Sequence, residues 1–471
     1  MSHLTAVILA AGLGTRMKST LPKVMHSIAG RPLLHYAVRA AFDAGVERVV
    51  VVTSGSQEIG ASLTREFGDR VATAVQDPAR GTGDAARIGL EQVQSERVLI
   101  LYGDTPLVRA EELKALVAAL EAPGAEELSV MTCELDAPAG YGRILRDSSG
   151  KVLEIREQRD LQGAEQHAVR EVNAGMYAGK TEAVRRALAE VRPNNSQGEY
   201  YLTDVIALLA RTSRVTGVLG HADALLGVND RSQLAEAEEL ILQRIRVRHA
   251  KNGVTVRGAP RIDDSVEIGV DSTIENGVCL RGQTRIGART VVDVGSVITD
   301  STIGDGALVK PYTVVTSSSV GDGAQLGPFA HLRPESEVEA DAHIGNFVET
   351  KKTRVRRGAK ANHLAYLGDG DIGERANVGA GTIFCNYDGF NKHKTIIGAD
   401  AFIGSDSQLV APITIGRGAY VATGTTVTMD IPDDALAIGR TKQTNKEGYA
   451  TRLKARFAAL KEAAKAAKPN G

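Results

Sequence analysis

Aliphatic residues recur at every sixth position through the second half of the chain, with Gly, Ala, Ser, Thr, Asp and Asn filling much of the space between them. Three runs keep this phase, from Ile262 to Ile298, from Val320 to Ile344 and from Ile397 to Val427. A helix has a period of about 3.6 residues and a half-buried strand a period of about 2, so neither fits alone. Short strands joined by tight turns, each with one aliphatic side chain in a narrow stacked core, do fit. The pattern predicts a parallel β-solenoid from about residue 254 to 430.

The first half alternates short apolar runs with helical patterns. Residues 4–11, LTAVILAA, end at Gly12, and Val49–Thr53 and Val98–Tyr102 are further apolar runs. Helical spacing follows in Leu33–Ala44 and Glu111–Leu120. This alternation predicts βαβ units and a covered, mostly parallel sheet up to about residue 228. Apolar residues three and four apart then predict a long amphipathic helix from residue 231 to about 250 that leads into the solenoid.

Charge and cysteine content narrow the function classes. A net charge of −1 argues against a large sequence-independent surface for nucleic acid or anionic lipid. Cys133, Cys279 and Cys385 are too far apart for a disulfide framework or a metal motif. No signal peptide and no apolar run of about 18 residues is present, so we expect a cytoplasmic protein. For the Ala- and Lys-rich stretch 446–468, a solvated helix or frayed tail is favoured over a nucleic-acid contact.

Glycine-rich turns follow several of the predicted strands. Gly12-Leu13-Gly14-Thr15-Arg16 follows the first strand and is succeeded by Lys23, and Gly81-Thr82-Gly83 and Gly140–Arg143 form further compact turns. Glycine lets backbone N–H groups approach phosphate oxygens closely, and the two cations add positive charge. Asp104 ends the strand Val98–Tyr102, at the edge where open α/β sheets bind ligands and where a hard cation could be held.

The segment LAAGLGTRM, followed four residues later by Pro22-Lys23, resembles the signature of the sugar-1-phosphate nucleotidyltransferases. With the hexapeptide solenoid behind it, the whole chain resembles the bifunctional N-acetylglucosamine-1-phosphate uridyltransferase/glucosamine-1-phosphate acetyltransferase family. The resemblance implies an α/β Rossmann-like uridyltransferase domain (1–230), a linker helix (231–251), and a left-handed parallel β-helix acetyltransferase domain with a basic C-terminal tail (252–471). It also implies a homotrimer, and a product that supplies peptidoglycan and lipopolysaccharide synthesis.

The resemblance assigns roles in the first domain. Asp104 and Asn229 would bind Mg²⁺, Lys23 would contact phosphate, and Arg16 and Lys23 would stabilise the charge that develops as a sugar 1-phosphate attacks UTP and expels pyrophosphate. The residues expected to bind the nucleotide-sugar are Leu9, Ala10, Ala11, Gly12, Lys23, Gln76, Gly81, Thr82, Tyr102, Gly103, Asp104, Gly142, Glu157, Asn173 and Asn229. Many relatives carry histidine where this chain has Asp84. A carboxylate near phosphates is unfavourable unless it faces away, so Asp84 receives no role.

The six-residue phase lapses between Ile344 and Ile397, where the sequence becomes unusually polar. A lone histidine is more often structural than catalytic, but His363 lies among cations and amides where a binding loop would project. The resemblance makes it the general base that deprotonates the amine of glucosamine 1-phosphate before attack on acetyl-CoA. Expected sugar-phosphate contacts are Arg333, Lys351, Tyr366 and Asn377. Expected acetyl-CoA contacts are Ala380, Asn386, Tyr387, Ser405, Thr423 and Arg440.

Three alternatives remain open at this point. Cys385 could act as a nucleophile, although the sequence places no partner base beside it. The chain could be a single-activity nucleotide-sugar pyrophosphorylase whose β-helix only assembles subunits or binds a regulator, which would leave His363 and Asn386 without a purpose. A non-catalytic scaffold of coils would leave Lys23 and Asp104 unexplained. We expect small-molecule substrates and neither a nucleic-acid nor a membrane partner.

Overall fold

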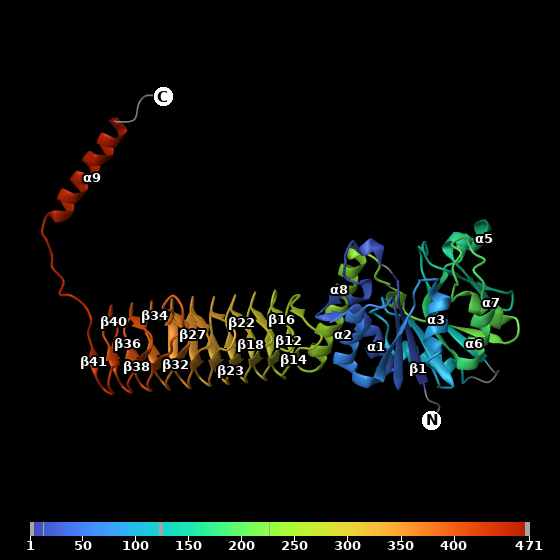
Figure 1. The fold of residues 1–471 in the computed structure, drawn as a ribbon, viewed down its shortest axis with the longest axis horizontal. Coiled ribbons are helices and arrows are strands. Elements are labelled where there is room, and N and C mark those ends of the chain that lie inside the picture. The colour runs from blue at the N-terminus through green and yellow to red at the C-terminus, as the bar shows by residue number, and fades with distance from the viewer. Residues whose placement is uncertain (1–3, 13, 122–125, 226, 467–471) are drawn as a thin grey trace. The chain divides into compact units, whose positions relative to one another are not determined.

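The computed structural model describes residues 4–12, 14–121, 126–225 and 227–466, which form two compact units, Met1–Arg285 and Ile286–Gly471 (Figure 1). Leu13 of the glycine-rich loop and the last residues of the predicted C-terminal tail lie outside this description. No helix in the described ranges combines the length and the apolar composition that crossing a membrane requires.

The first unit is built on a nine-stranded sheet in the order β11-β7-β10-β6-β1-β4-β5, with β8 paired to β10 and β9 paired to β8. Its strands are β1 (Leu4–Ala10), β4 (Arg48–Thr53), β5 (Val71–Val75), β6 (Arg97–Tyr102), β7 (Glu126–Glu134), β8 (Arg143–Arg146), β9 (Val152–Arg156), β10 (Glu171–Lys180) and β11 (Arg214–Leu219). The predicted parallel pairs are present, β1 with β4 and β6 among them. The difference is β10, which runs antiparallel to β6 and β7. A strand buried on both faces is apolar along its whole length, whichever way it runs. Its hydrophobic pattern therefore does not reveal the antiparallel direction.

Helices cover both faces of this sheet and create two apolar cores. One core joins β1 to α1 (Leu33–Asp43) and α4 (Ala110–Ala119), and the other joins it to α3 (Thr82–Leu90), α6 (Thr181–Glu190) and α7 (Asp204–Ala210). Further helices are α2 (Gln57–Phe67), α5 (Gly163–Ala168) and α8 (Arg231–Lys251), and β2 (Ser27–Ile28) and β3 (Arg31–Pro32) form a small hairpin. Asp230 caps α8 by accepting a hydrogen bond from the Gln233 backbone N–H, 2.9 Å away. A double-sided core of this kind is what holds the loops at the sheet's carboxyl edge in place.

Three arginines meet at Asp264, in the first coils, which also belong to this unit. These coils contain β12 (Thr255–Val256), β13 (Arg261–Ile262), β14 (Glu267–Ile268), β15 (Thr273–Ile274) and β16 (Cys279–Arg281). The Asp264 carboxylate accepts hydrogen bonds from Arg31 at 2.7 Å, Arg39 at 2.8 Å and Arg248 at 2.8 Å. Its backbone N–H donates to Ala29 O at 3.0 Å. One carboxylate therefore connects the β2–β3 hairpin, α1, α8 and the first coils.

The second unit is a stack of short parallel strands in three sheets, a fold consistent with a left-handed β-helix (Figure 1). The first sheet contains β18 (Val291–Val292), β21 (Leu308–Val309), β24 (Gln325–Leu326), β27 (His343–Asn346), β30 (Lys360–His363), β33 (Asn377–Val378), β36 (Phe402–Ile403), β39 (Tyr420–Val421) and β41 (Leu436–Ala437). The second contains β19 (Val297–Thr299), β22 (Val314–Thr316), β25 (His331–Leu332), β28 (Glu349–Lys351), β31 (Tyr366–Gly368), β34 (Ile383–Cys385), β37 (Gln408–Val410) and β40 (Thr426–Val427). The third contains β20 (Thr302–Ile303), β23 (Ser319–Val320), β26 (Glu337–Val338), β29 (Arg354–Val355), β32 (Gly370–Ile372), β35 (Thr395–Ile397) and β38 (Ile413–Ile415).

The aliphatic residues that predicted this fold form its core. The aliphatic residues at every sixth position of the three runs are all buried except Ile268, which is half-buried. The apparent lapse between Ile344 and Ile397 is not an interruption of the stack. Ala361, Leu367, Ile372, Val378 and Phe384 continue the core, while one turn of several coils is a residue shorter, which shifts the six-residue phase. The one enlarged coil in the second unit's described part carries residues 386–394 between β34 and β35.

A column of exposed aromatic side chains follows one turn of the second unit. Tyr312, Phe329 and Phe347 occupy left-handed backbone positions and stack with ring centroids 5.3 and 5.4 Å apart. Leu364 takes the same left-handed conformation in the next coil, immediately after His363. About half or more of each side chain is exposed. We call these four residues the aromatic column. The C-terminal helix α9 (Tyr449–Ala466) follows the coils, and its Tyr449, Phe457 and Leu460 are also exposed.

Candidate active sites

In the first unit, Lys23 lies between the two residues predicted to bind metal. Its ammonium group contacts the Asp104 carboxylate and donates to Asn229 Oδ1 at 3.2 Å. Asp104 follows β6, and its carbonyl accepts a hydrogen bond from Val228 N at 2.9 Å, which holds the segment preceding α8 against the sheet edge. The site therefore presents a carboxylate oxygen and an amide oxygen that already converge on a cation.

Those donors fit a hard divalent cation. Oxygen ligands suit such ions, and Mg²⁺ is commonly held by one or two protein groups together with substrate phosphates. No group of three or more His, Cys, Asp or Glu side chains suited to a metal occurs in the described ranges. A metal here would therefore depend on Asp104 and Asn229 and on oxygens supplied by the substrate.

The glycine-rich loop after β1 packs closely on Lys23. Gly14 has a φ of 57°, and a Cβ at this position would lie 2.6 Å from Lys23 Cβ. Leu9, Ala10 and Ala11 are buried at the end of β1, whereas Gly12 and Arg16 are exposed. Glycine at position 14 permits this approach, which gives the Lys23 side chain its direction. Arg16 lies on the short helix Thr15–Met17, where its side chain is exposed to solvent.

A second group of predicted residues surrounds the start of β10. Asn173 N donates to Gly142 O at 2.9 Å, and its side chain donates to the Tyr177 hydroxyl at 2.7 Å. A Cβ on Gly142 would lie 3.3 Å from a Glu157 carboxylate oxygen. Burial raises the pKa of Glu157, although a hydrogen bond from Thr203 opposes this shift. Gly142, Glu157 and Asn173 thus form one polar group.

Tyr102 and Gly103 connect these two groups. Gly103 N donates to Leu9 O at 2.9 Å, and a Cβ on Gly103 would lie 2.9 Å from Leu34 Cδ1. The Tyr102 ring packs so closely on Gly175 that a Cβ there would approach within 2.5 Å. Burial raises the pKa of the Tyr102 hydroxyl well above its ordinary value, so the group stays protonated at neutral pH. Tyr102 offers a neutral surface and a hydroxyl, not a charge.

The third predicted group lies at the start of α3. Gln76 Nε2 donates to Gly81 O at 3.0 Å, and Thr82 Oγ1 accepts from Leu202 N at 3.1 Å. Gly81 has a φ of 111° and touches Tyr200, where any Cβ would lie 2.5 Å from the Tyr200 carbonyl oxygen. Sequence alone does not point to Tyr200. It contacts the glycine turn because a segment about 120 residues later in the chain packs against that turn.

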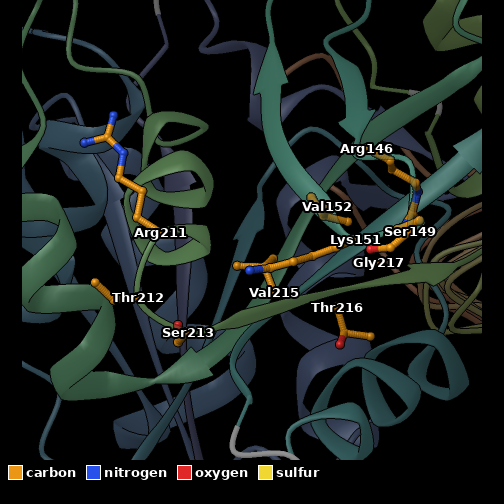
Figure 2. A pocket seen from close by; sticks show the side chains of 11 residues that line it. Arg146, Ser149, Lys151, Val152, Arg211, Thr212, Ser213, Val215, Thr216 and Gly217 are labelled. Carbon is orange, nitrogen blue, oxygen red and sulfur yellow. The ribbon is translucent and has the colours of Figure 1, made fainter.

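A cavity of about 600 Å³ in the same unit contains none of these residues. Figure 2 shows side chains from β8, β9 and β11 around it, with Arg211 pointing away from the others that are labelled. Arg146 is paired with Glu171 at 2.6 Å, and Lys151 donates to Ala210 O at 3.0 Å. Arg146 and Lys151 are therefore engaged with the protein, and the cavity contains no predicted site residue.

In the second unit, His363 ends β30 and is joined to Asn346, one coil earlier. His363 Nδ1 lies 2.8 Å from Asn346 Oδ1. Because an amide oxygen only accepts, Nδ1 carries the proton and Nε2 keeps its lone pair. His363 is exposed, so this lone pair can reach a substrate amine. Asn346 was missed from the sequence, because its closeness to His363 depends on the 17-residue coil that the register shows.

Most of the predicted acetyl-CoA residues share one turn of successive coils with His363. Asp406 N donates to Ala380 O at 2.7 Å, and Gly424 N donates to Ser405 O at 2.9 Å. Thr423 O accepts from Arg440 Nη1 at 2.7 Å. The register of β30, β33, β36 and β39 places His363, Ala380, Ser405 and Thr423 in line. These residues form an edge long enough for an extended ligand.

The predicted sugar-phosphate residues lie on the neighbouring sheet. Arg333 and Lys351 occupy equivalent places after β25 and at the end of β28, and Arg333 is paired with Glu349 at 2.8 Å. One coil further, the Tyr366 hydroxyl and the Asn386 amide both approach Gly368, where a Cβ would lie 2.6 Å from each. Asn386 is buried and donates to Asp369 at 2.5 Å.

Two predicted residues stand apart from that group. In the strand register, Asn377 lies beside Lys360 and Phe402. It is therefore not on the sheet that carries Arg333 and Lys351. Tyr387 lies in the enlarged coil, is 58% exposed and donates to Gly389 O at 2.5 Å. Cys385 Sγ contacts only Ile383 O, at 3.9 Å, among its polar contacts in the described residues.

The fold and these two sites define a nucleotidyltransferase joined to a hexapeptide-repeat transferase. Residues 6–170 match the family model of the MobA-like NTP transferase domain, and residues 394–428 match that of the bacterial transferase hexapeptide, with six repeats.

Curated relatives extend the match to the whole chain. A protein of Sorangium cellulosum (strain So ce56) named "Bifunctional protein GlmU" is 59% identical over 469 residues, which cover 98% of each chain. A protein of that name from Anaeromyxobacter dehalogenans (strain 2CP-C) is 49% identical over 96% of this chain and 93% of its own. Another, from Caldanaerobacter subterraneus subsp. tengcongensis, is 45% identical over 95% and 98%. The chain belongs to this GlmU family of bifunctional proteins. The nucleotidyltransferase part implies a nucleotide substrate and a divalent metal, and the hexapeptide repeats are consistent with oligomer formation.

Proposed function

We propose that this chain makes UDP-N-acetylglucosamine in two reactions, each at its own site. The site around His363 transfers an acetyl group from acetyl-CoA to glucosamine 1-phosphate. The site around Lys23 transfers a uridyl group from UTP to N-acetylglucosamine 1-phosphate, with release of pyrophosphate. The observation that carries the proposal is that the two sets of residues lie in different compact units. The functional division we propose is 1–230, a linker helix at 231–251, and 252–471.

At the uridyl site, the protein brings together two anions that repel each other, UTP and N-acetylglucosamine 1-phosphate. Lys23 and Arg16 offset the charge of the triphosphate, and the polar group of Gly142, Glu157 and Asn173 holds the sugar. A sugar-phosphate oxygen then attacks the α-phosphate directly, so no side-chain nucleophile is required. Mg²⁺, held by Asp104 and Asn229 when bound, supplies further charge neutralisation. Lys23 would exchange its contact with these two residues for one with phosphate.

At the acetyl site, His363 acts as the base. Nε2 takes a proton from the acceptor ammonium, and Asn346 holds the imidazole in the tautomer that allows this. Arg333 and Lys351 bind the sugar phosphate, with Tyr366 and Asn377 beside the sugar. Ala380, Asn386, Tyr387, Ser405, Thr423 and Arg440 line the acetyl-CoA side, where Ser405 would donate to the developing oxyanion.

Acetyl transfer is direct in this proposal. The one polar contact of Cys385 Sγ in the described residues is with a backbone oxygen, which cannot act as the base that a cysteine nucleophile requires. A Cys385→Ala variant is therefore expected to retain acetyl transfer. Loss of transfer with unchanged coenzyme affinity would instead support a thioester intermediate on Cys385.

The assembly we propose is a homotrimer, working in the cytoplasm on small-molecule substrates. The aromatic column supports this, because a continuous apolar strip of exposed side chains on stacked coils is typical of a surface covered by another subunit. It also ends at Leu364, beside His363, so a covering subunit would lie next to the acetyl site.

Two single substitutions test the proposal. Asp104→Ala is expected to abolish UTP-dependent pyrophosphate release and to spare acetyl transfer, and His363→Ala is expected to do the reverse. Asp136→Ala and His167→Ala are matched controls, since both side chains are exposed and their polar contacts in the described residues, with Arg170 and Gly163, include no predicted site residue. If either folded variant lost both activities, the two-site proposal would fail.

A further inference from the structure

The amide of Gln76 has a fixed orientation. Gln76 follows β5 and is 3% exposed. Its Nε2 donates to the Gly81 carbonyl at 3.0 Å and to Asp84 Oδ2 at 2.9 Å. Both partners are acceptors, so turning the amide by 180° would replace two hydrogen bonds with two oxygen–oxygen repulsions.

Asp84 is itself held in place. Its side chain is 7% exposed, and Arg87 Nη2 donates to its second oxygen, Oδ1, at 2.7 Å. Burial acts to raise the pKa of Asp84, but the hydrogen bonds from Gln76 and Arg87 outweigh it, so the pKa lies below its ordinary value. Asp84 is therefore an ionised, acceptor-only group at neutral pH, and its two oxygens face Gln76 and Arg87.

This arrangement leaves one atom of Gln76 available. Oε1 receives no hydrogen bond from the described part of the chain, and it is not among the enclosed unpartnered atoms found there. A ligand at the turn between β5 and α3 would therefore meet a hydrogen-bond acceptor and no amide donor from Gln76.

We propose that Asp84 is a specificity-determining residue, which locks Gln76 so that the site selects a pyrimidine whose ring nitrogen donates a hydrogen bond. Uracil carries an N–H at N3, whereas cytosine has a lone pair there and would face the Gln76 oxygen with repulsion. This rests on the proposed function, in which Gln76 contacts the base. Asp84 acts through Gln76 and does not touch the nucleotide.

The test compares UTP with CTP in the pyrophosphate-release assay on the full-length protein. The ratio of kcat/KM for UTP to that for CTP is expected to fall about tenfold or more in Asp84→Asn. Asparagine keeps the shape, but its NH₂ group can donate to Gln76 Oε1, so the second amide orientation becomes accessible. The ratio compares two substrates on the same protein, so partial misfolding, which lowers both rates together, does not change it.

Glu91→Gln is the matched control. Glu91 also lies beside Arg87, at 3.6 Å, but makes no contact with Gln76, so its ratio should equal that of the unmodified protein. An equal shift in both variants would mean that charge, not amide orientation, sets the preference, and would overturn the inference.

A substrate analogue gives a second test that needs no variant. N3-methyl-UTP lacks the donor, and the unmodified protein should use it at least tenfold less well than UTP. Equal use of both would contradict the inference. Failure of the unmodified protein to use UTP at all would refute the proposed function instead, and an unchanged ratio in Asp84→Asn would refute only the role of Asp84.

Discussion

His363 depends on an amide from the coil before it. Asn346 is its only side-chain partner in the described structure, and it fixes both the tautomer and the direction of the ring. Asn346→Ala is therefore expected to lower kcat for acetyl transfer about tenfold, with pyrophosphate release unchanged. Steady-state assays of both reactions measure this. Asn346→Asp keeps an acceptor and should recover much of the loss, whereas wild-type kcat in Asn346→Ala would contradict the assignment.

His249, near the end of α8, makes stability depend on pH. Burial, with the nearby Arg248, lowers its pKa from 6.5 to about 4, although Asp264 opposes the shift. Between pH 6.5 and about 4, His249 is therefore protonated in the unfolded chain but not in the folded chain. Its contribution to stability is complete above pH 6.5 and is lost as the pH falls toward 4. The expected loss from His249 is about 2 kcal/mol at pH 5.

Urea unfolding at pH 7 and pH 5 tests this. The free energy of unfolding should fall less between the two pH values in His249→Phe than in the unmodified protein, because phenylalanine does not titrate. Equal decreases would mean that His249 is not protonated on unfolding in this range.

Several site residues could be recognised from sequence, and others could not. Lys23 and Asp104 follow strands in patterns that carry their own signal. Asn346 could be found only once the coil length was known, because nothing else relates it to His363. Asp84 receives no role from the sequence, because a carboxylate near phosphates is unfavourable unless it faces away. The structure turns its side chain toward Gln76.

At the scale of elements, Asp264 links four segments. Its side chain is 11% exposed, and removing its charge would leave three arginines without their shared anionic partner. Asp264→Asn should lower the free energy of unfolding of the first unit by about 2 kcal/mol. Breaking a fully buried ion pair costs about 3–5 kcal/mol. The loss here is smaller because Arg39 and Arg248 are partly solvated.

Thermal and urea unfolding measure this effect. Glu267→Gln is the control, because Glu267 forms an exposed pair with Arg285 at 3.3 Å and should contribute less than about 0.5 kcal/mol. Equal destabilisation by both substitutions would show that Asp264 is no more than a surface charge.

The elements themselves were predicted with differing success. The solenoid was recognised because each coil repeats the same burial pattern, and the α/β alternation predicted the parallel pairs of the first sheet. The antiparallel direction of β10 was not predicted, since strand direction depends on the connections and not on the strand's own residues. The lapse after Ile344 reflects shorter turns and one enlarged coil in a continuous stack, which the sequence alone does not distinguish from an interruption.

At the scale of the whole molecule, the aromatic column should control assembly. Introducing charge by Phe329→Asp together with Phe347→Asp would make burial of the strip costly. Sedimentation velocity should then show a monomer, with acetyl transfer strongly reduced and pyrophosphate release retained. Tyr449→Asp, on the exposed helix α9, is a control for adding charge at an exposed aromatic residue. A variant that sedimented as the unmodified protein would exclude this surface from the interface.

The enlarged coil also bears on how the chain finds its alignment while folding. Elsewhere in the second unit, coils of 16 to 18 residues repeat nearly the same aliphatic core, so displacement by one whole coil would bury an equivalent set of side chains. Ile372, by contrast, pairs with Ile397, 25 residues later. Asn386, buried at this point, finds its partner Asp369 only in the native alignment. A displaced stack would leave that amide buried and unpaired. The enlarged coil thus makes the native alignment of the coils more favourable than a displaced one.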